Sequence, residues 1–189
     1  MFAELRCTLR ARARASPLFA LFSLLSLCAM FAIAPQARAA ELPEYRLKAA
    51  FLYNFALFTD WPANAGGTLN LCIYGTDPFG DEINGLEGKM VGERNIALSR
   101  KAAGESLKSC QIVFVSTAAI GNLPRVLAEL RGLPVLTVAD SAGATKQGVA
   151  LNMAVVQNKI TFEANLQAAR AARLNLSSKL LRLATEVQQ

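Results

Sequence analysis

Side chains that support catalysis are few in this chain, and histidine is absent. The 189-residue sequence contains no His, so neither a Ser-His-Asp triad nor a Cys-His pair can be built, and the commonest ligand of catalytic zinc is missing. Ser177, Ser178 and Lys179 are adjacent and lack the S-x-x-K spacing of acylating serine enzymes. The residues therefore predict no catalytic group, no metal site and no cofactor.

Three carboxylates follow a segment that is predicted to be a buried strand. Asp77, Asp81 and Glu82 come directly after residues 68–74, and open α/β sheets bind ligands beyond the carboxyl ends of their strands. The favoured interpretation is structural. Asp77 is a natural N-cap and Pro78 a natural first helical residue, so the other two carboxylates are expected in a solvated first turn.

A small-ligand site is the alternative use of the same loop. Thr76 and Asp77, together with the loop after Ser116, could line a crevice at the ends of neighbouring strands. The loop 75–80 could also present backbone N–H groups to an anion, although it lacks the G-x-G-x-x-G and Walker spacings. A periplasmic small-ligand binding module is therefore a second candidate function.

The first 39 residues have the pattern of a secretory signal. An apolar run over 18–34 follows a basic segment and precedes the small-x-small sequence Ala37-Arg38-Ala39. The basic segment contains Arg6, Arg10, Arg12 and Arg14. We expect cleavage after residue 39, which leaves 40–189 as a single exported domain. A retained anchor is the alternative, because the apolar run is near the lower limit for spanning a bilayer.

The cysteine content and the net charge of residues 40–189 narrow the possible classes of protein and partner further. Cys72 and Cys110 remain after the leader, and in an oxidising compartment such a pair is expected to form one disulfide, with two buried thiols as the alternative. Residues 1–39 hold five of the 20 basic and one of the 14 acidic residues, so residues 40–189 carry a net charge of +2. Basic residues are dispersed, with no cluster longer than Arg100-Lys101, so the sequence shows no polybasic membrane patch and argues against nucleic acid as a partner.

Hydrophobic periodicity predicts an α/β fold. A helix with an aromatic stripe is expected over 44–58 and ends before Trp61-Pro62. Strands are expected at 68–74, 95–98, 111–116 and 134–139, and a helix at 123–130. Alternation of this kind is typical of a mostly parallel sheet with helices on both faces.

The pattern changes in the last quarter of the chain. Residues 149–156 and 159–165 flank Gln157-Asn158, which predicts an antiparallel hairpin with a two-residue turn. Helices are expected over 166–172 and 177–184, the second capped by Ser177 or Ser178. The apolar face of that last helix is expected to consist of Leu176, Leu180, Leu183 and Ala184.

Several blocks of the sequence resemble one known family. The opening block YRLKAAFLYNFALFTDWP at 45–62 resembles the signature of the YfiR-like periplasmic proteins. LNLCIYGTDPFG at 69–80 and SCQIVFVS at 109–116 are similar to its next two blocks, and FEANLQAARAARLNLSSKLLRLA at 162–184 to its last. The resemblance covers essentially all of residues 40–189.

The resemblance implies a regulator rather than an enzyme. YfiR-like proteins are repressors that bind the periplasmic sensor domain of an inner-membrane diguanylate cyclase, which lowers cyclic-di-GMP and biofilm formation. An OmpA-like outer-membrane lipoprotein is implied as a titrating partner, and a homodimer as the oligomeric state. The resemblance also implies a disulfide at Cys72 and Cys110 and a second one near the hairpin, where this chain has Thr145 and Asn152.

A repressor of this kind needs a surface that favours one state of its partner. We expect this surface on the hairpin and the helix that follows. The candidate contact residues are Leu151, Ile160, Phe162, Glu163 and Arg170. The alternative for each is an ordinary structural role, in the core for the apolar residues and in solvent for the charged ones. An accessory enzyme without histidine is a third, minor candidate function.

Overall fold

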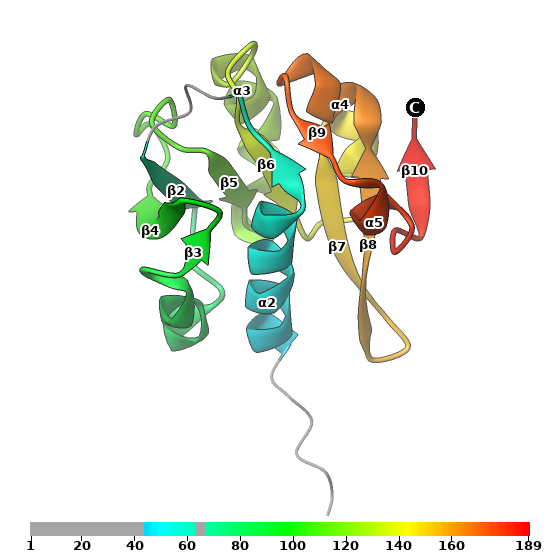
Figure 1. Ribbon diagram of the computed structural model, residues 1–189, viewed down its shortest axis with the longest axis horizontal. Coiled ribbons are helices and arrows are strands. Elements are labelled where there is room, and N and C mark those ends of the chain that lie inside the picture. Colours follow the sequence, from blue (N-terminus) through cyan, green and yellow to red (C-terminus); the bar gives the residue numbers. More distant parts are fainter. Residues whose placement is uncertain (1–43, 63–66) are drawn as a thin grey trace, which may run out of the picture. The chain divides into compact units, whose positions relative to one another are not determined.

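The computed structural model describes residues 44–62 and 67–189 (Figure 1). The predicted signal at 1–39 lies outside these residues and stays a prediction. Among the described residues, eight strands form one sheet in the order β10-β8-β7-β6-β5-β2-β4-β3. Their bounds are β2 (Thr68–Tyr74), β3 (Met90–Val91), β4 (Arg94–Lys101), β5 (Ile112–Val115), β6 (Leu136–Ala139), β7 (Leu151–Val156), β8 (Lys159–Asn165) and β10 (Glu186–Gln188).

The sheet is mixed, so the prediction of a mostly parallel sheet is only partly right. The central strands β4, β2, β5, β6 and β7 pair in parallel. Towards the edges β3 pairs antiparallel with β4, and β8 antiparallel with β7, while β10 pairs in parallel with β8. Each reversal of direction follows a short connection, which a parallel pair does not allow.

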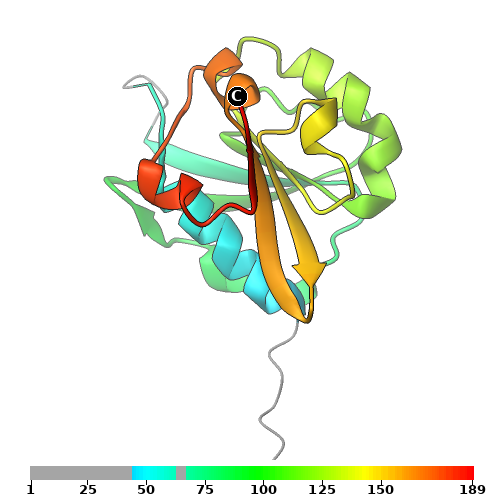
Figure 2. The ribbon, with the colours of Figure 1, turned by 90° about the vertical axis from the view of Figure 1, so that its right-hand side faces the viewer.

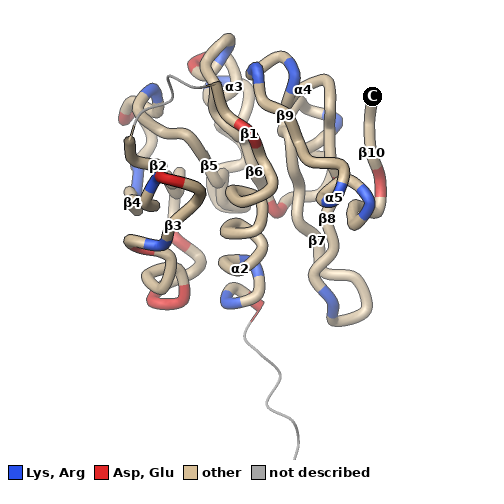
Figure 3. The backbone as a smooth tube through the Cα atoms, viewed as in Figure 1, with Lys and Arg blue, Asp and Glu red and all other residues tan. Residues whose placement is uncertain are grey.

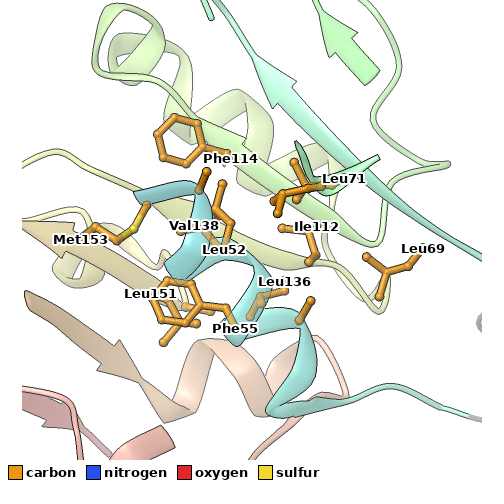
Figure 4. Packing of buried hydrophobic residues seen from close by; sticks show 14 of the residues in the cluster. Leu52, Phe55, Leu69, Leu71, Ile112, Phe114, Leu136, Val138, Leu151 and Met153 are labelled. Carbon is orange, nitrogen blue, oxygen red and sulfur yellow. The ribbon is translucent and has the colours of Figure 1, made fainter. Parts of the chain in front are cut away.

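Helices cover both faces of the sheet, and each face has its own hydrophobic cluster. On one face lies α2 (Glu44–Leu57), whose Leu52 and Phe55 pack against side chains of the central strands (Figure 4). On the other lies α3 (Leu123–Glu129), preceded by the 3₁₀ helix η2 (Thr117–Asn122) (Figure 2). Successive residues of β2 and β5 point to opposite faces of the sheet and therefore enter the two clusters alternately. This is expected for strands that are covered on both faces.

The predicted helix over 44–58 is confirmed to within one residue at its end. Thr59 follows it, and its hydroxyl donates to the carbonyl of Phe55 at 2.7 Å. The next residues form β1 (Thr59–Asp60), which pairs antiparallel with β9 (Asn175–Leu176). This two-stranded sheet was not predicted, because two residues are too few to give a pattern.

The predicted hairpin is confirmed. Residues of β7 and β8 pair antiparallel from Leu151↔Ala164 to Val156↔Lys159. Both turn residues have positive φ, 50° at Gln157 and 58° at Asn158. Positive φ at two consecutive residues defines the type I′ turn, whose twist matches that of the flanking strands.

The C-terminal segment differs from its prediction. The asparagine Asn165 caps α4 (Leu166–Ala171), with its side-chain oxygen 2.8 Å from the N–H of Ala168. Ser177 caps α5 as predicted, but α5 (Ser178–Leu181) is a single turn. Residues after it turn back to form β10 instead of extending the helix. Leu183 is therefore 71% exposed and not part of the expected apolar face.

Candidate partner-binding surface

Polar clusters of the described domain do not form a metal site. No group of three or more His, Cys, Asp or Glu residues that could hold a metal ion is present in 44–62 and 67–189. Within the same residues, none of the helices is both long and apolar enough to cross a membrane.

The loop proposed as a ligand crevice is closed by its own contacts. One carboxylate oxygen of Asp77 accepts the N–H of Phe79 at 2.7 Å, and the other faces Nε of Arg100 at 2.7 Å. Arg100 also donates to the carbonyl of Gly80 and to Oδ1 of Asn84. Both oxygens of Asp77 are thus engaged with protein groups. Thr76 beside it is exposed, and its predicted role in a ligand site would have to be filled without the carboxylate of Asp77.

The helix expected from Pro78 begins later than predicted. The 3₁₀ helix η1 (Gly80–Leu86) starts two residues on, and its N-cap is Phe79. Asp77 bonds to the N–H two residues ahead, which makes an Asx-turn rather than a helix cap. Asp81 accepts from Asn84, and Glu82 lies 3.9 Å from Arg46, so these carboxylates do not converge with Asp77.

Two of the five predicted contact residues are in the core. Leu151 and Phe162 are 0% and 2% exposed, and the ring of Phe162 lies 5.1 Å from that of Phe55 on α2. They belong to the face of the sheet that α2 covers. The prediction that they contact a partner is wrong for this conformation, because a partner cannot reach them without moving α2.

The other three predicted contact residues are accessible to different degrees. Arg170 is exposed on α4, and Ile160 is partly buried against the core. Glu163 accepts a 2.8 Å hydrogen bond from the hydroxyl of Thr145.

The side chain of Asn152 is also bonded, because its oxygen accepts the N–H of Ser141 at 3.1 Å. The two positions where the resemblance implies a second disulfide are therefore occupied by side chains with hydrogen bonds of their own.

The end of the β7–β8 hairpin carries the exposed apolar residues of this region. Val155 and Val156 are 47% and 51% exposed, and their cross-strand partners are Ile160 and Lys159. We call these four residues the hairpin tip. Val155 and Val156 are consecutive in the strand, so they point to opposite faces of the hairpin, and each face of the tip presents one exposed valine.

A buried ion pair ties α2 to the end of β6. Nζ of Lys48 lies 2.7 Å from Oδ2 of Asp140, and the two side chains are 5% and 1% exposed. Glu44 pairs with the same ammonium group, and Tyr45 lies with its ring centroid 4.4 Å from it. Oδ1 of Asp140 accepts the hydroxyl of Thr117 at 2.8 Å, so the carboxylate is satisfied on both oxygens.

Opposing effects set the pKa values in this cluster. Burial lowers the pKa of Lys48, but hydrogen bonds to Asp140 and Glu44 raise it, and the net direction is upward. Burial, followed by the charge of Asp140, raises the pKa of Tyr45. The lysine therefore stays charged and the tyrosine neutral well above neutral pH. The sequence does not indicate this ion pair, because Lys48 lies off the apolar stripe of its helix and such a lysine is ordinarily expected in solvent.

The two cysteines form the predicted disulfide. Cys72 on β2 and Cys110, just before β5, are bonded across 38 residues with their Cα atoms 5.9 Å apart. Both are 1% exposed and lie in the cluster on the α3 face. The bond closes a loop that contains β3 and β4, and it links the neighbouring central strands β2 and β5.

A groove lies between α3 and α4 on the same face. Its volume is about 540 Å³. The lining includes Leu127, Ala128, Gly132, Gln167, Ala168 and Ala171. At the end of α4, Nη2 of Arg173 donates to the carbonyl of Gly132 at 2.7 Å. The groove is large enough for a small molecule and has a mixed apolar and amide lining.

These features define a disulfide-bonded, mixed α/β domain. Its hairpin tip carries exposed valines, and the polar side chains around Asp77 and Lys48 bond to other groups of the protein. A family model described as YfiR/HmsC-like matches residues 45–185. The chain therefore belongs to the YfiR/HmsC-like family, which confirms the resemblance noted from its sequence blocks. A search of curated proteins finds no match to the chain.

Proposed function

We propose that this protein is a periplasmic repressor of an inner-membrane diguanylate cyclase. It binds the periplasmic sensor domain of the cyclase, holds the enzyme in its inactive state, and so lowers cyclic-di-GMP and biofilm formation. Membership of the YfiR/HmsC-like family over residues 45–185 is the observation that carries the proposal, and it supports a regulatory role. A homodimer, and titration by an OmpA-like outer-membrane lipoprotein, belong to the same proposal.

Two structural features agree with this role. The disulfide between Cys72 and Cys110 suits an oxidising compartment such as the periplasm. The hairpin tip is an accessible surface that presents one exposed valine on each face of the hairpin. Repression follows if the inactive state of the cyclase binds this surface more tightly, by about 1.4 kcal/mol for each tenfold shift in population.

The hairpin tip is expected to be needed for binding. The double variant Val155→Thr/Val156→Thr keeps β-branched side chains, and hence the strand, but replaces two exposed methyl groups by hydroxyls. We expect it to weaken binding of the purified cyclase sensor domain about tenfold, since burying each methyl contributes about 0.8 kcal/mol. Titration calorimetry measures the change.

Met90→Thr is the matched control, because Met90 is 53% exposed on β3 at the opposite edge of the sheet. Its unfolding midpoint and affinity should equal those of the unmodified chain. Equal affinity of the hairpin variant and the unmodified chain, with the sensor domain still bound, would place the contact elsewhere. Absence of any binding by the unmodified chain would contradict the proposed function itself.

The groove between α3 and α4 favours a second candidate function, a small-ligand binding module. Its volume of about 540 Å³ fits a nucleotide or an amino acid. A ligand at one hundred times its dissociation constant should add about 2.7 kcal/mol to the free energy of unfolding. A thermal-shift screen against nucleotides and amino acids, repeated with Ala168→Trp to fill the groove, tests this. A shift that survives Ala168→Trp, or no shift at all, rejects the groove as a ligand site.

A further inference from the structure

The C-terminal part of the domain carries basic residues without acidic ones. Between Ala164 and Thr185 the sequence contains four cations and no Asp or Glu. They are Arg170, Arg173, Lys179 and Arg182, and we call them the basic strip. All four are exposed, and none of them is in an ion pair within the described residues. Their charges are therefore not neutralised by the domain.

The four cations are separated along the sequence, but the elements that carry them, α4, its connection to β9 and α5, pack on one hydrophobic cluster. The N–H of Leu174 bonds to the carbonyl of Ala169, which folds the connection to β9 back on α4. Lys179 and Arg182 are three residues apart at α5, a spacing that places them on the same side of a helical turn. Figure 3 shows basic segments on α4, on its connection to β9 and around α5.

An exposed leucine lies within this basic surface. Leu183 directly follows Arg182 and, at 71%, is the most exposed of the large hydrophobic residues of the described chain. Leu180 beside it is buried and anchors the turn. The segment thus presents a single apolar side chain next to cations, on a backbone held by the core.

Charge is distributed unevenly along the domain as a whole. Residues 44–105 contain eight acidic and six basic residues, whereas residues 106–189 contain four acidic and nine basic ones. The net charges of the two parts are −2 and +5. An anionic surface therefore attracts the second part and repels the first, which orients the domain with the basic strip towards that surface.

We propose that the basic strip and Leu183 dock on anionic phospholipid headgroups at a membrane surface. The strip combines exposed positive charge with one exposed leucine, and residues 164–185 contain no aromatic residue. Lipid headgroups require only exposed positive charge and an apolar side chain that enters the interface. The membrane setting rests on the proposed function, whose partner is an inner-membrane protein.

Sedimentation with vesicles tests the proposal directly. The purified chain should sediment with vesicles of phosphatidylglycerol and phosphatidylcholine at low salt, be released by added salt, and stay in solution with phosphatidylcholine alone. Lys179→Gln/Arg182→Gln should weaken binding about twenty-fivefold, since each cation near an anionic surface contributes about fivefold. Leu183→Ser should weaken it a further few-fold.

Lys108→Gln/Arg125→Gln is the matched control, because both residues are exposed cations outside the strip and the change in net charge is the same. It should weaken vesicle binding far less than Lys179→Gln/Arg182→Gln does, because only the long-range attraction of its charges is lost. Equal loss in both double variants, or no binding to anionic vesicles, overturns the proposal. So does loss of sensor-domain binding by Lys179→Gln/Arg182→Gln without vesicle binding, which would identify an acidic protein surface instead. Because vesicles contain no cyclase, failure of the proposed function leaves the expected result unchanged.

Discussion

Replacing Cys110 by serine is expected to lower the free energy of unfolding by about 4 kcal/mol and to release the cyclase from repression. The bond closes a 38-residue separation, and its loss frees the corresponding loop in the unfolded chain. A domain of this size is stable by only about 5–15 kcal/mol. Urea unfolding of the purified variant measures the first effect, and cellular cyclic-di-GMP the second.

Ser109→Ala is the control for this variant, because Ser109 is exposed and directly precedes Cys110 in the sequence. It should unfold at the same urea concentration as the unmodified chain. Reduction of the unmodified chain under denaturing conditions should lower its refolded stability to that of Cys110→Ser. Unchanged stability together with intact repression in Cys110→Ser would show that the disulfide does not hold the binding surface in place.

Asp140→Ala is expected to cost about 3–5 kcal/mol, the usual effect of leaving one member of a buried ion pair without its partner. The change leaves the ammonium group of Lys48 buried, with only the partly exposed Glu44 as a counter-ion. Glu82→Ala removes an exposed ion pair of 3.9 Å and should change stability by less than about 1 kcal/mol. Denaturant titrations of the two variants compare the buried and the exposed pair.

The double variant Lys48→Met/Asp140→Leu separates the ion pair from packing. It removes both charges and keeps apolar volume, so it should recover much of the stability lost in Asp140→Ala. If Asp140→Ala is no less stable than Glu82→Ala, α2 does not depend on this pair. If the double variant is less stable than Asp140→Ala, packing rather than charge holds α2 to the sheet.

The same cluster predicts loss of stability in alkali. The folded-state pKa of Lys48 is raised, so its contribution is complete below the pKa of an unfolded lysine and is lost as pH rises through the folded value. The pKa of Tyr45 is raised as well, and its neutral form is the one that folding favours. Stability should therefore be level from neutral pH to about pH 10 and fall above it. The fall should be shallower in Lys48→Met/Asp140→Leu.

Local patterns predicted the local parts of this fold. The strand at 68–74 and the hairpin around Gln157-Asn158 depend on short-range alternation and turn residues, and both were placed correctly. The prediction of a helix over 177–184 was wrong in length for a non-local reason. Residues 186–188 pair with β8, so the chain leaves the helix after one turn. Strand β4 was predicted too short, since its burial alternates incompletely near the edge of the sheet.

The candidate site was less predictable than the fold. Leu151 and Phe162 were chosen from the hairpin pattern, but periodicity cannot tell which face of a strand a helix covers. The Lys48–Asp140 pair joins residues 92 positions apart, and neither flank gives a local signal. The disulfide was predictable, because residues 40–189 contain two cysteines, which leave a single possible pairing.

Strand β10 pairs with β8 and forms one edge of the sheet, and it is the last of the described elements along the chain. When residues 186–188 are detached, β8 is an unpaired edge, and it belongs to the hairpin with the exposed valines. Such edges recruit strands from other chains. Loss of this three-residue pairing is therefore sufficient to expose an edge at which two copies of the chain can join and aggregate.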